Sequence, residues 1–364
     1  MLKILDRYIT KELLGPFMYG IAAFSSILAG STVLFPLVGE GVKYSIPVWD
    51  VIQLFIYKMP SIIVFTFPMS MLLATILSFG RLNSDLEIIA FRASGISFIR
   101  LVIPVIIIGL LVSIMTIWFS ESIVPKASNS AEELLRSYTH QKRPALKKNV
   151  NITEYDSEGE PMRITNVRSI EKELLQDITV AEFENARLTR VIRADTGQWL
   201  PTGGWEFYSG VMHHFPSNDK HKLLYIEFEK EFIDIRINPF DMTKRSKKAE
   251  EMTASELKEQ IELKHQTGED PTKDIMNYHL KFSVPFASLI FAILGASVGL
   301  RPYRSSSTFG LGMSLVVILI YYVLLSISMG FGLSRAIPAV LAAWIPNILI
   351  GSTGLYLLER NSKR

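Results

Sequence analysis

The sequence lacks cysteine, and it lacks the motifs by which enzymes commonly hold nucleotides or metals. Without cysteine there are no disulfides, no cysteine-ligated metals and no thiol chemistry, although this absence does not identify a compartment. There is no GxxxxGK(S/T) loop, so we do not expect this chain to hydrolyse ATP itself. The adjacent His213 and His214 would face opposite sides of a strand, and no HExxH or GxSxG motif accompanies them. We therefore expect no catalytic residues, no metal and no cofactor.

Charge is scarce as well, and it is unevenly placed. The formal net charge is +3 over 364 residues and the basic residues are dispersed, which argues against a nucleic-acid partner. Charged residues are concentrated between roughly 126 and 276, whereas both ends of the chain are strongly apolar. This partition predicts two membrane halves, about 1–125 and 277–364, around an inserted domain at 126–276.

Long apolar runs are plentiful, and each membrane half contains three. A bilayer-spanning helix takes about 20 residues. Six stretches meet this length, at approximately 14–38, 51–79, 101–124, 278–300, 308–331 and 337–358. The expected fold is a multi-domain membrane protein with six transmembrane α-helices, three before and three after the inserted domain.

Lysine and arginine in the short loops set the orientation, because these residues favour the cytoplasmic side. One side has Lys43 and Arg335 in its short loops. The other side has Lys3, Arg7, Lys11, Arg81, Arg92, Arg100, Arg301, Arg304, Arg360, Lys363 and Arg364. We expect a multi-pass membrane protein with both termini and Gly80–Gly95 cytoplasmic and the inserted domain outside the cytoplasmic membrane.

The inserted domain is expected to be an antiparallel β-domain of the sandwich or jelly-roll kind. Short strand-like runs follow one another between residues 149 and 237. In one run Trp205, Phe207 and Val211 share one parity, and in the last run the parity shifts near Lys230, which predicts a bulge or bend. Helical connectors flank the strands, and the second, ASELKEQIELKHQ, follows a capping box that begins at Thr253.

A short charged stretch, Gly80–Gly95, lies between the second and third apolar runs. Ser84 and Glu87 have the spacing of a capping box, which predicts a cytoplasmic helix at about 84–95 that ends at Gly95. Asp85 and Glu87 would lie near the positive end of its dipole and Arg92 near the negative end. An apolar stripe follows a helical spacing, at Leu82, Leu86, Ile89 and Ala93. Such a stripe serves equally to rest on the membrane or to enter a groove on a partner protein.

Several longer motifs occur in a characteristic order. LDRYITKELLGPF opens the chain, FPMSMLLATILSFGRLNSDLEIIAFRASGISFIRLVIPV follows, NYHLKFSVPFASLIFAILG opens the second membrane half, and AWIPN lies in the last span. Together with the arrangement of spans, they resemble the lipopolysaccharide-export permeases of the LptF/LptG type over essentially the whole chain.

The resemblance implies a half-transporter in an ATP-driven exporter that extracts lipopolysaccharide from the membrane. The implied partners are a second permease of the same family, a cytoplasmic ABC ATPase dimer and a single-span periplasmic bridge protein that the β jelly-roll joins. Gly80–Gly95 matches the coupling-helix segment of the family, with Glu87 at its acidic position and Gly95 at its glycine. Arg81 and Arg92 stand beside them and are added as candidate contacts. The resemblance leaves open which of the two paralogues this chain corresponds to, and whether it forms a homodimer or a heterodimer.

A second candidate site consists of basic groups near the outer ends of the spans. Its members are Lys43, Lys58, His279, Lys281 and Arg335. A basic rim around an apolar cavity would suit a phosphorylated glycolipid, since a charge inside a span usually faces protein or water. Lysine and arginine near the interface also snorkel to the headgroups, which is the simpler interpretation for Lys43 and Arg335. Lys281 matches a basic position that the family often shows four residues before a proline, here Pro285.

Two other functions remain open at this stage. One is an ABC permease for another lipid or a lipoprotein, or one that drives an external enzyme. The other is a membrane-anchored scaffold whose periplasmic domain binds partners and transports nothing.

Overall fold

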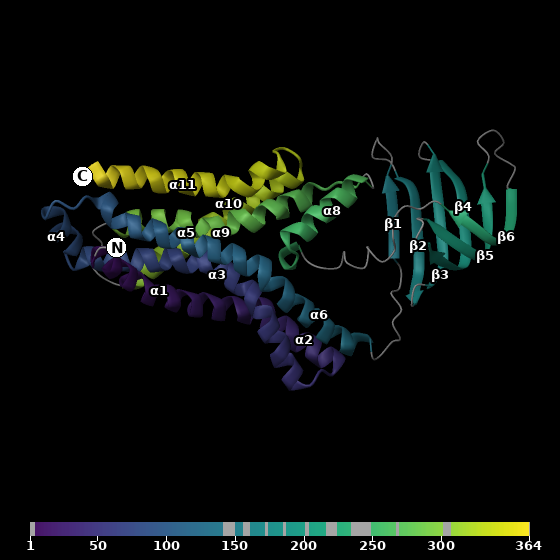
Figure 1. Ribbon diagram of the computed structural model, residues 1–364, viewed down its shortest axis with the longest axis horizontal. Helices are drawn as coiled ribbons and strands as arrows, with labels where there is room; N and C mark the ends of the chain where they lie inside the picture. Colours follow the sequence, from purple (N-terminus) through teal and green to yellow (C-terminus); the bar gives the residue numbers. More distant parts are fainter. Residues whose placement is uncertain are drawn as a thin grey trace. The chain divides into compact units, whose positions relative to one another are not determined.

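The computed structural model describes residues 4–140, 150–155, 161–171, 174–184, 187–200, 204–215, 224–233, 249–266, 269–300 and 307–363 (Figure 1). The chain forms two compact units. The first comprises Met1–Leu135, Ala249–Lys258 and Thr272–Arg364, and the second comprises Arg136–Lys248 and Glu259–Pro271.

The first unit is a bundle of long apolar helices. Among the described residues, six helical segments are long and apolar enough to cross a membrane, which confirms the expected spans. The first is α1 (Ile4–Leu28), the π-helix η1 (Ala29–Leu34) and α2 (Phe35–Tyr44) in succession. The others are α3 (Val48–Ser84), α5 (Phe98–Ser122) with α6 (Val124–His140), α9 (Thr272–Gly299), α10 (Ser307–Leu333) and α11 (Ala339–Lys363).

The core of the bundle lies where α3 and α9 cross. The most apolar stretch of α3 is 83% buried, whereas that of α10 is 22% buried. Gly295 of α9 permits the close approach, because a Cβ there would lie 2.8 Å from the Cβ of Thr75 on α3. The two helices therefore form the rigid centre, and α10 leaves most of its apolar surface for lipid or another chain.

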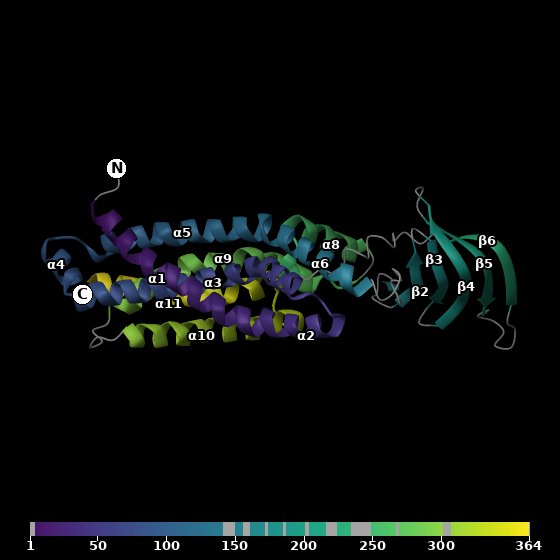
Figure 2. The same cartoon turned by 90° about the horizontal axis from the view of Figure 1, so that it is seen from below.

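The second unit contains a six-stranded antiparallel sheet (Figures 1 and 2). Its strands are β1 (Val150–Tyr155), β2 (Pro161–Glu171), β3 (Leu174–Glu184), β4 (Arg187–Trp199), β5 (Trp205–His214) and β6 (Leu224–Ile233). Each strand pairs with the next in chain order. The antiparallel sheet confirms the predicted class, but the described strands do not show the crossover connections of a jelly roll.

The buried positions of the sheet change parity part-way along several strands. In β3, Leu175 and Ile178 are both buried, and Asp177 between them has a left-handed φ of 52°. In β5, Phe207 and Met212 are both buried, and Ser209 between them has a φ of 51°. A left-handed residue turns the strand and so exchanges the side-chain faces beyond it.

The change of parity along the strands corrects one prediction and agrees with another. Met212, rather than the predicted Val211, continues the buried face of Trp205 and Phe207. The predicted change of parity near Lys230 is confirmed on β6, because Phe228 packs against the core of the sheet and Ile233 is buried, and the two have opposite parity. The pairing of β6 with β5 keeps one register, so no residue is inserted there.

The connector before α9 contains the short 3-10 helix η2 (Ala249–Glu251) and α8 (Ala254–Gln266). The predicted capping box is confirmed. The Thr253 amide donates to Glu256 Oε2 at 2.7 Å, and the Glu256 amide donates to Thr253 Oγ1 at 3.1 Å.

Candidate functional site

The short segment between the second and third spans forms α4 (Glu87–Ala93), at the same end of the bundle as the start of α1 and the end of α11 (Figures 1 and 2). The predicted capping box at Ser84 is wrong. Ser84 is the last residue of α3, so its backbone is helical, and the residue before α4 is Leu86 with a left-handed φ of 59° and no side-chain cap. An N-cap requires a non-helical residue, which Ser84 is not. The helix is consequently shorter than the predicted span of about 84–95.

The end of α4 agrees with the prediction. Gly95 has a φ of +83°. Its amide donates to Arg92 O at 3.0 Å, and the Ile96 amide donates to Phe91 O at 3.0 Å. These two bonds form a Schellman motif, in which glycine is favoured because a Cβ would strain the left-handed backbone.

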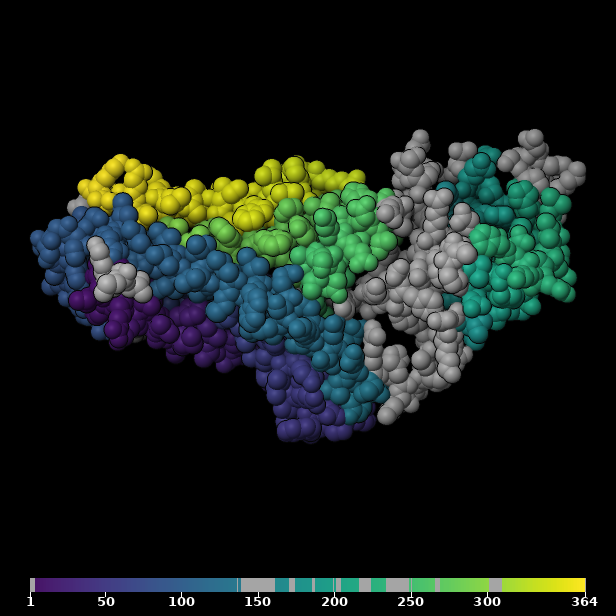
Figure 3. Space-filling view, in the orientation of Figure 1, coloured from purple at the N-terminus to yellow at the C-terminus, as the bar shows by residue number. Residues whose placement is uncertain are grey.

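The predicted apolar stripe is divided between two surroundings. Of the predicted stripe, Leu82 is 2% exposed and packs into the core of the bundle, whereas Ala93 is exposed. Ile88, which is not part of that stripe, is 3% exposed and packs into the same core. Leu86 and Ile89 are 62% and 57% exposed. The segment thus docks on its own spans through Ile88 and leaves Leu86 and Ile89 exposed. Figure 3 shows the segment at the surface, at the left end of the view.

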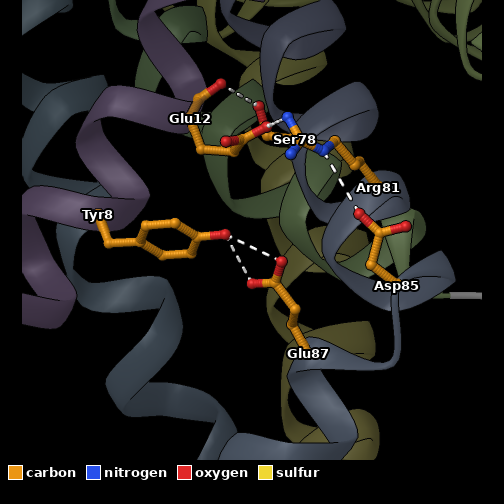
Figure 4. A network of polar contacts seen from close by, with 6 residues as sticks. All are labelled: Tyr8, Glu12, Ser78, Arg81, Asp85 and Glu87. Atoms are coloured by element: carbon orange, nitrogen blue, oxygen red, sulfur yellow. Dashed lines mark hydrogen bonds and ion pairs between the residues drawn. The ribbon is translucent and has the colours of Figure 1, made fainter.

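A hydrogen bond ties the start of α4 to α1 (Figure 4). The Tyr8 hydroxyl donates to the Glu87 carboxylate, at 2.9 Å from Oε1 and 2.7 Å from Oε2. Glu87 therefore turns back toward its own bundle rather than capping its own helix. Among the described residues, Arg92 near the end of α4 makes no ion pair and is exposed.

Three ion pairs extend this connection to α3 and α5. Arg81 Nη1 lies 2.6 Å from Glu12 Oε1 on α1, and Arg81 Nε lies 3.4 Å from Asp85 Oδ2 (Figure 4). Arg100 at the start of α5 lies 2.7 Å from Asp6 Oδ1. The first three turns of α1 therefore contact the end of α3, the start of α4 and the start of α5.

Sequence analysis missed the contribution of α1. One signal was present, since Asp6, Ile9 and Leu13 recur at helical spacing and all three are buried. A carboxylate on the buried face of an apolar helix requires a partner, which Arg100 supplies. The partners of Tyr8 and Glu12 could not be identified without the fold, because both bonds join residues more than 60 positions apart.

Of the five basic candidates, Lys281 is the most deeply placed. Its side chain is 5% exposed, and Nζ lies 2.8 Å from Glu121 Oε1 at the end of α5. The second oxygen of Glu121 accepts the Ala254 amide at 2.8 Å. Lys281 also lines a pocket between α3, α5, α9 and α10.

The structure does not bring the other four basic candidates to that pocket. Lys43 is exposed at the end of α2, with Nζ 5.1 Å from the centre of the Tyr44 ring. Lys58 is partly buried in α3 and has no ion partner among the described residues, and His279 lies on α9, two residues before Lys281. Arg335 is exposed directly after α10, with a left-handed φ of 58°. No group of three metal-ligating side chains occurs in the part of the chain that the structure describes.

Comparison with known proteins agrees with this architecture. A search of curated proteins finds no match to this chain. The family described as lipopolysaccharide export system permease LptF/LptG matches residues 7–360, which is nearly the whole chain. The six apolar helices and the antiparallel sheet inserted between the third and fourth spans agree with that assignment. The chain therefore belongs to the LptF/LptG family of lipopolysaccharide export permeases.

Proposed function

We propose that this permease is driven by ATP hydrolysed on a separate cytoplasmic ATPase dimer, and that α4 receives the driving motion. The observation that carries this proposal is the division of the α4 surface. Ile88 holds the segment to the bundle, while Leu86 and Ile89 present an apolar face outside it. An exposed apolar patch on a short helix suits docking into a groove on a partner.

The contacts with α1 explain how a push on α4 would reach the spans. The segment is joined to α3 and α5 by only a few residues, and Tyr8 and Glu87 link it to α1. Arg81 and Glu12 join the end of α3 to the next turn of α1. Because these polar links cross between helices, a displacement of α4 would be transmitted to the inner ends of three spans as long as the links are held.

The orientation follows the distribution of basic residues. Both chain ends and α4 lie on the side rich in lysine and arginine, so this side is cytoplasmic and the sheet unit is periplasmic. The protein is then a multi-pass subunit of the cell inner membrane, paired with a second permease of its family.

The substrate of this permease is lipopolysaccharide, held by apolar walls and a basic rim. Lys58 is the leading rim residue, because it is partly buried within a span and lacks a carboxylate partner among the described residues. His279 lies on α9, and His279, Lys43 and Arg335 complete the rim or interact with lipid headgroups, whereas Lys281 is paired with Glu121. A photocrosslinker at position 58 should capture lipopolysaccharide in cells, and capture of phospholipid alone would exclude the rim.

The sheet unit passes the glycolipid to a single-span periplasmic bridge protein. The edge strand β6 exposes Leu224, Tyr225 and Ile226, each by about half of its surface, with values of 53%, 55% and 48%. An exposed edge with apolar side chains favours the addition of a strand from a partner.

The coupling proposal is tested by changing the exposed face of α4. Replacing Leu86 and Ile89 with serine should abolish co-purification of the ATPase and coupled transport, while the permease remains folded. The matched control is Ile99→Ser, because Ile99 is 46% exposed at the same end of the bundle but belongs to α5. Retention of the ATPase by the double variant would contradict the proposal. A non-transporting scaffold or a permease for another lipid would instead be recognised by the absence of captured lipopolysaccharide.

A further inference from the structure

The pocket beside Lys281 is almost entirely apolar. Its volume is about 180 Å³, and it lies among four membrane-spanning helices. Side chains of α3, α9 and α10 form most of its walls, including Val64, Phe65, Leu280, Val284, Leu325 and Met329. The volume exceeds that of an engineered cavity of about 150 Å³ that binds benzene. The pocket can therefore hold the end of an alkyl chain of at least about six carbons, by the same comparison.

The polar end of this pocket carries no net charge. Lys281 and Glu121 neutralise one another at 2.8 Å. Glu121 uses its other oxygen to accept the Ala254 amide at 2.8 Å, so both carboxylate oxygens are engaged. An anionic ligand would have to displace Glu121 from both bonds, while a cationic ligand would meet a buried ammonium.

We propose that this pocket binds a single uncharged alkyl chain, and that Glu121 sets this specificity by neutralising Lys281. The occupant is an uncharged long-chain amphiphile, such as a fatty alcohol, whose hydroxyl end lies near Ser120 and Asn277. The site lies within one subunit and does not depend on the proposed coupling or on the rim at Lys58. Ala249 of η2 also lines the pocket, so the occupant contacts the connector that precedes α9.

Two photoactivatable probes of equal chain length test the proposal, one a diazirine-bearing fatty alcohol and the other the matching alkyl phosphate. Each is added to the full-length protein in lipid nanodiscs, and the crosslinked residues are mapped by mass spectrometry. The alcohol should label the pocket segments of α3 and α9 several-fold more than the phosphate does. An excess of unlabelled decanol should remove this labelling but should not affect labelling at Leu319, which is 63% exposed on α10.

Two variants separate the pocket from its charge. Ser61→Phe narrows the pocket and should reduce labelling by both probes, whereas Leu319→Phe on the outer face should leave pocket labelling unchanged. Glu121→Gln exposes Lys281 to the pocket and should reverse the preference toward the phosphate. Labelling of the pocket that equals labelling of the outer face and resists decanol would overturn the proposal. A preference of the unaltered protein for the phosphate would overturn the assignment of an uncharged ligand, while leaving the coupling proposal untouched.

Discussion

Two glutamates, at opposite ends of the helical bundle, each join separate helices in a different way. Glu87 at the start of α4 accepts a hydrogen bond from the neutral hydroxyl of Tyr8. Glu121 at the end of α5 binds the buried ammonium of Lys281 and the amide that opens α8. A hydrogen bond to a carboxylate contributes about 1.5–3 kcal/mol net, whereas breaking a buried ion pair costs about 3–5 kcal/mol.

The two glutamates therefore differ in how easily their contacts can be broken. At the α4 end, the bond from Tyr8 is partly exposed, and Arg81 is 61% exposed in its pair with Glu12. Partly exposed links are weak and can be exchanged for contacts with a partner. At the Glu121 end, the ammonium of Lys281 is buried, and the carboxylate of Glu121 is its ion partner. We infer that movement enters at α4 while the helix ends around Glu121 stay fixed.

The largest effect should come from removing the charge of Glu121. Glu121→Gln leaves the ammonium of Lys281 buried without a counter-charge, and we expect it to lower the free energy of unfolding by about 3–5 kcal/mol. Adding Lys281→Met to this variant should restore most of the lost free energy of unfolding, because both charged side chains are then replaced by uncharged ones of similar size. The free energies of unfolding of the single and the double variant are measured in one detergent, together with that of Glu87→Gln. If Glu121→Gln lowers the free energy of unfolding no more than Glu87→Gln does, the proposed difference between the two glutamates is wrong.

A third carboxylate, Glu182, lies in the sheet, so the effect of charge on a paired carboxylate can also be tested outside the membrane-spanning helices. Burial alone would raise the pKa of Glu182, but the hydrogen bond from Arg190 and the charge of Arg163 outweigh it and hold the pKa below its usual value. A carboxyl with a lowered pKa stabilises the fold above its unfolded pKa, and this stabilisation is lost as the pH falls through the folded value.

Glu182→Gln should therefore destabilise the sheet at neutral pH by about 1–3 kcal/mol, since hydrogen bonds to charged groups are lost. Between pH 6 and pH 3 the difference between the variant and the unaltered protein should shrink. Fluorescence of the buried Trp205, in a variant whose other four tryptophans are replaced by phenylalanine, reports on the sheet during unfolding of the full chain. A difference that is constant over this range would show that Glu182 acts through packing instead of charge.

The end of α4 offers a smaller and purely conformational test. Gly95 and Gly80 both have open space where a Cβ would lie, but Gly95 alone of the two has a left-handed φ, of +83°. Gly95→Ala should cost about 1 kcal/mol, the penalty of a left-handed backbone for an L-residue, and loosen the end of α4. Gly80→Ala should be neutral or slightly stabilising, because Gly80 lies within a helix. Equal effects of the two changes on unfolding would remove the assigned role of Gly95.

The hydroxyl of Tyr8 tests whether the weak joint matters for coupling. Tyr8→Phe removes the bond to Glu87 and should cost about 1.5 kcal/mol of stability, the low end for a hydrogen bond to a charged group, because the bond is partly exposed. We expect a larger fractional loss in transport per ATP hydrolysed, because α4 is then released from α1. Tyr19→Phe is the matched control, since Tyr19 lies on the same helix and is 57% exposed. Normal coupling in the Tyr8 variant would assign the transmission to Arg81 and Glu12 instead.

Much of the architecture could be predicted because it follows from local pattern. The apolar runs predicted the six spans, the alternation predicted the sheet, and Gly95 predicted the end of α4. The polar contacts of Tyr8, Glu12 and Glu121 could not be predicted, because each joins helices far apart in the sequence. The length of α3 also escaped prediction, since nothing local stops that helix before Ser84.

The smallest predicted effect concerns two motifs with the same spacing. Thr253 and Glu256 form both bonds of a capping box, whereas Ser84 and Glu87 form neither, because α3 continues through Ser84 and Glu87 bonds with Tyr8. Thr253→Ala should therefore cost about 1 kcal/mol, and Ser84→Ala should change the free energy of unfolding by less than about 0.5 kcal/mol. Unfolding of both variants in one detergent gives the comparison. A cost for Ser84→Ala as large as that for Thr253→Ala would mean that α3 ends earlier and that Ser84 caps α4 after all. The contact between Tyr8 and Glu87 would then be wrong, and so would the weak link that it forms between α1 and α4.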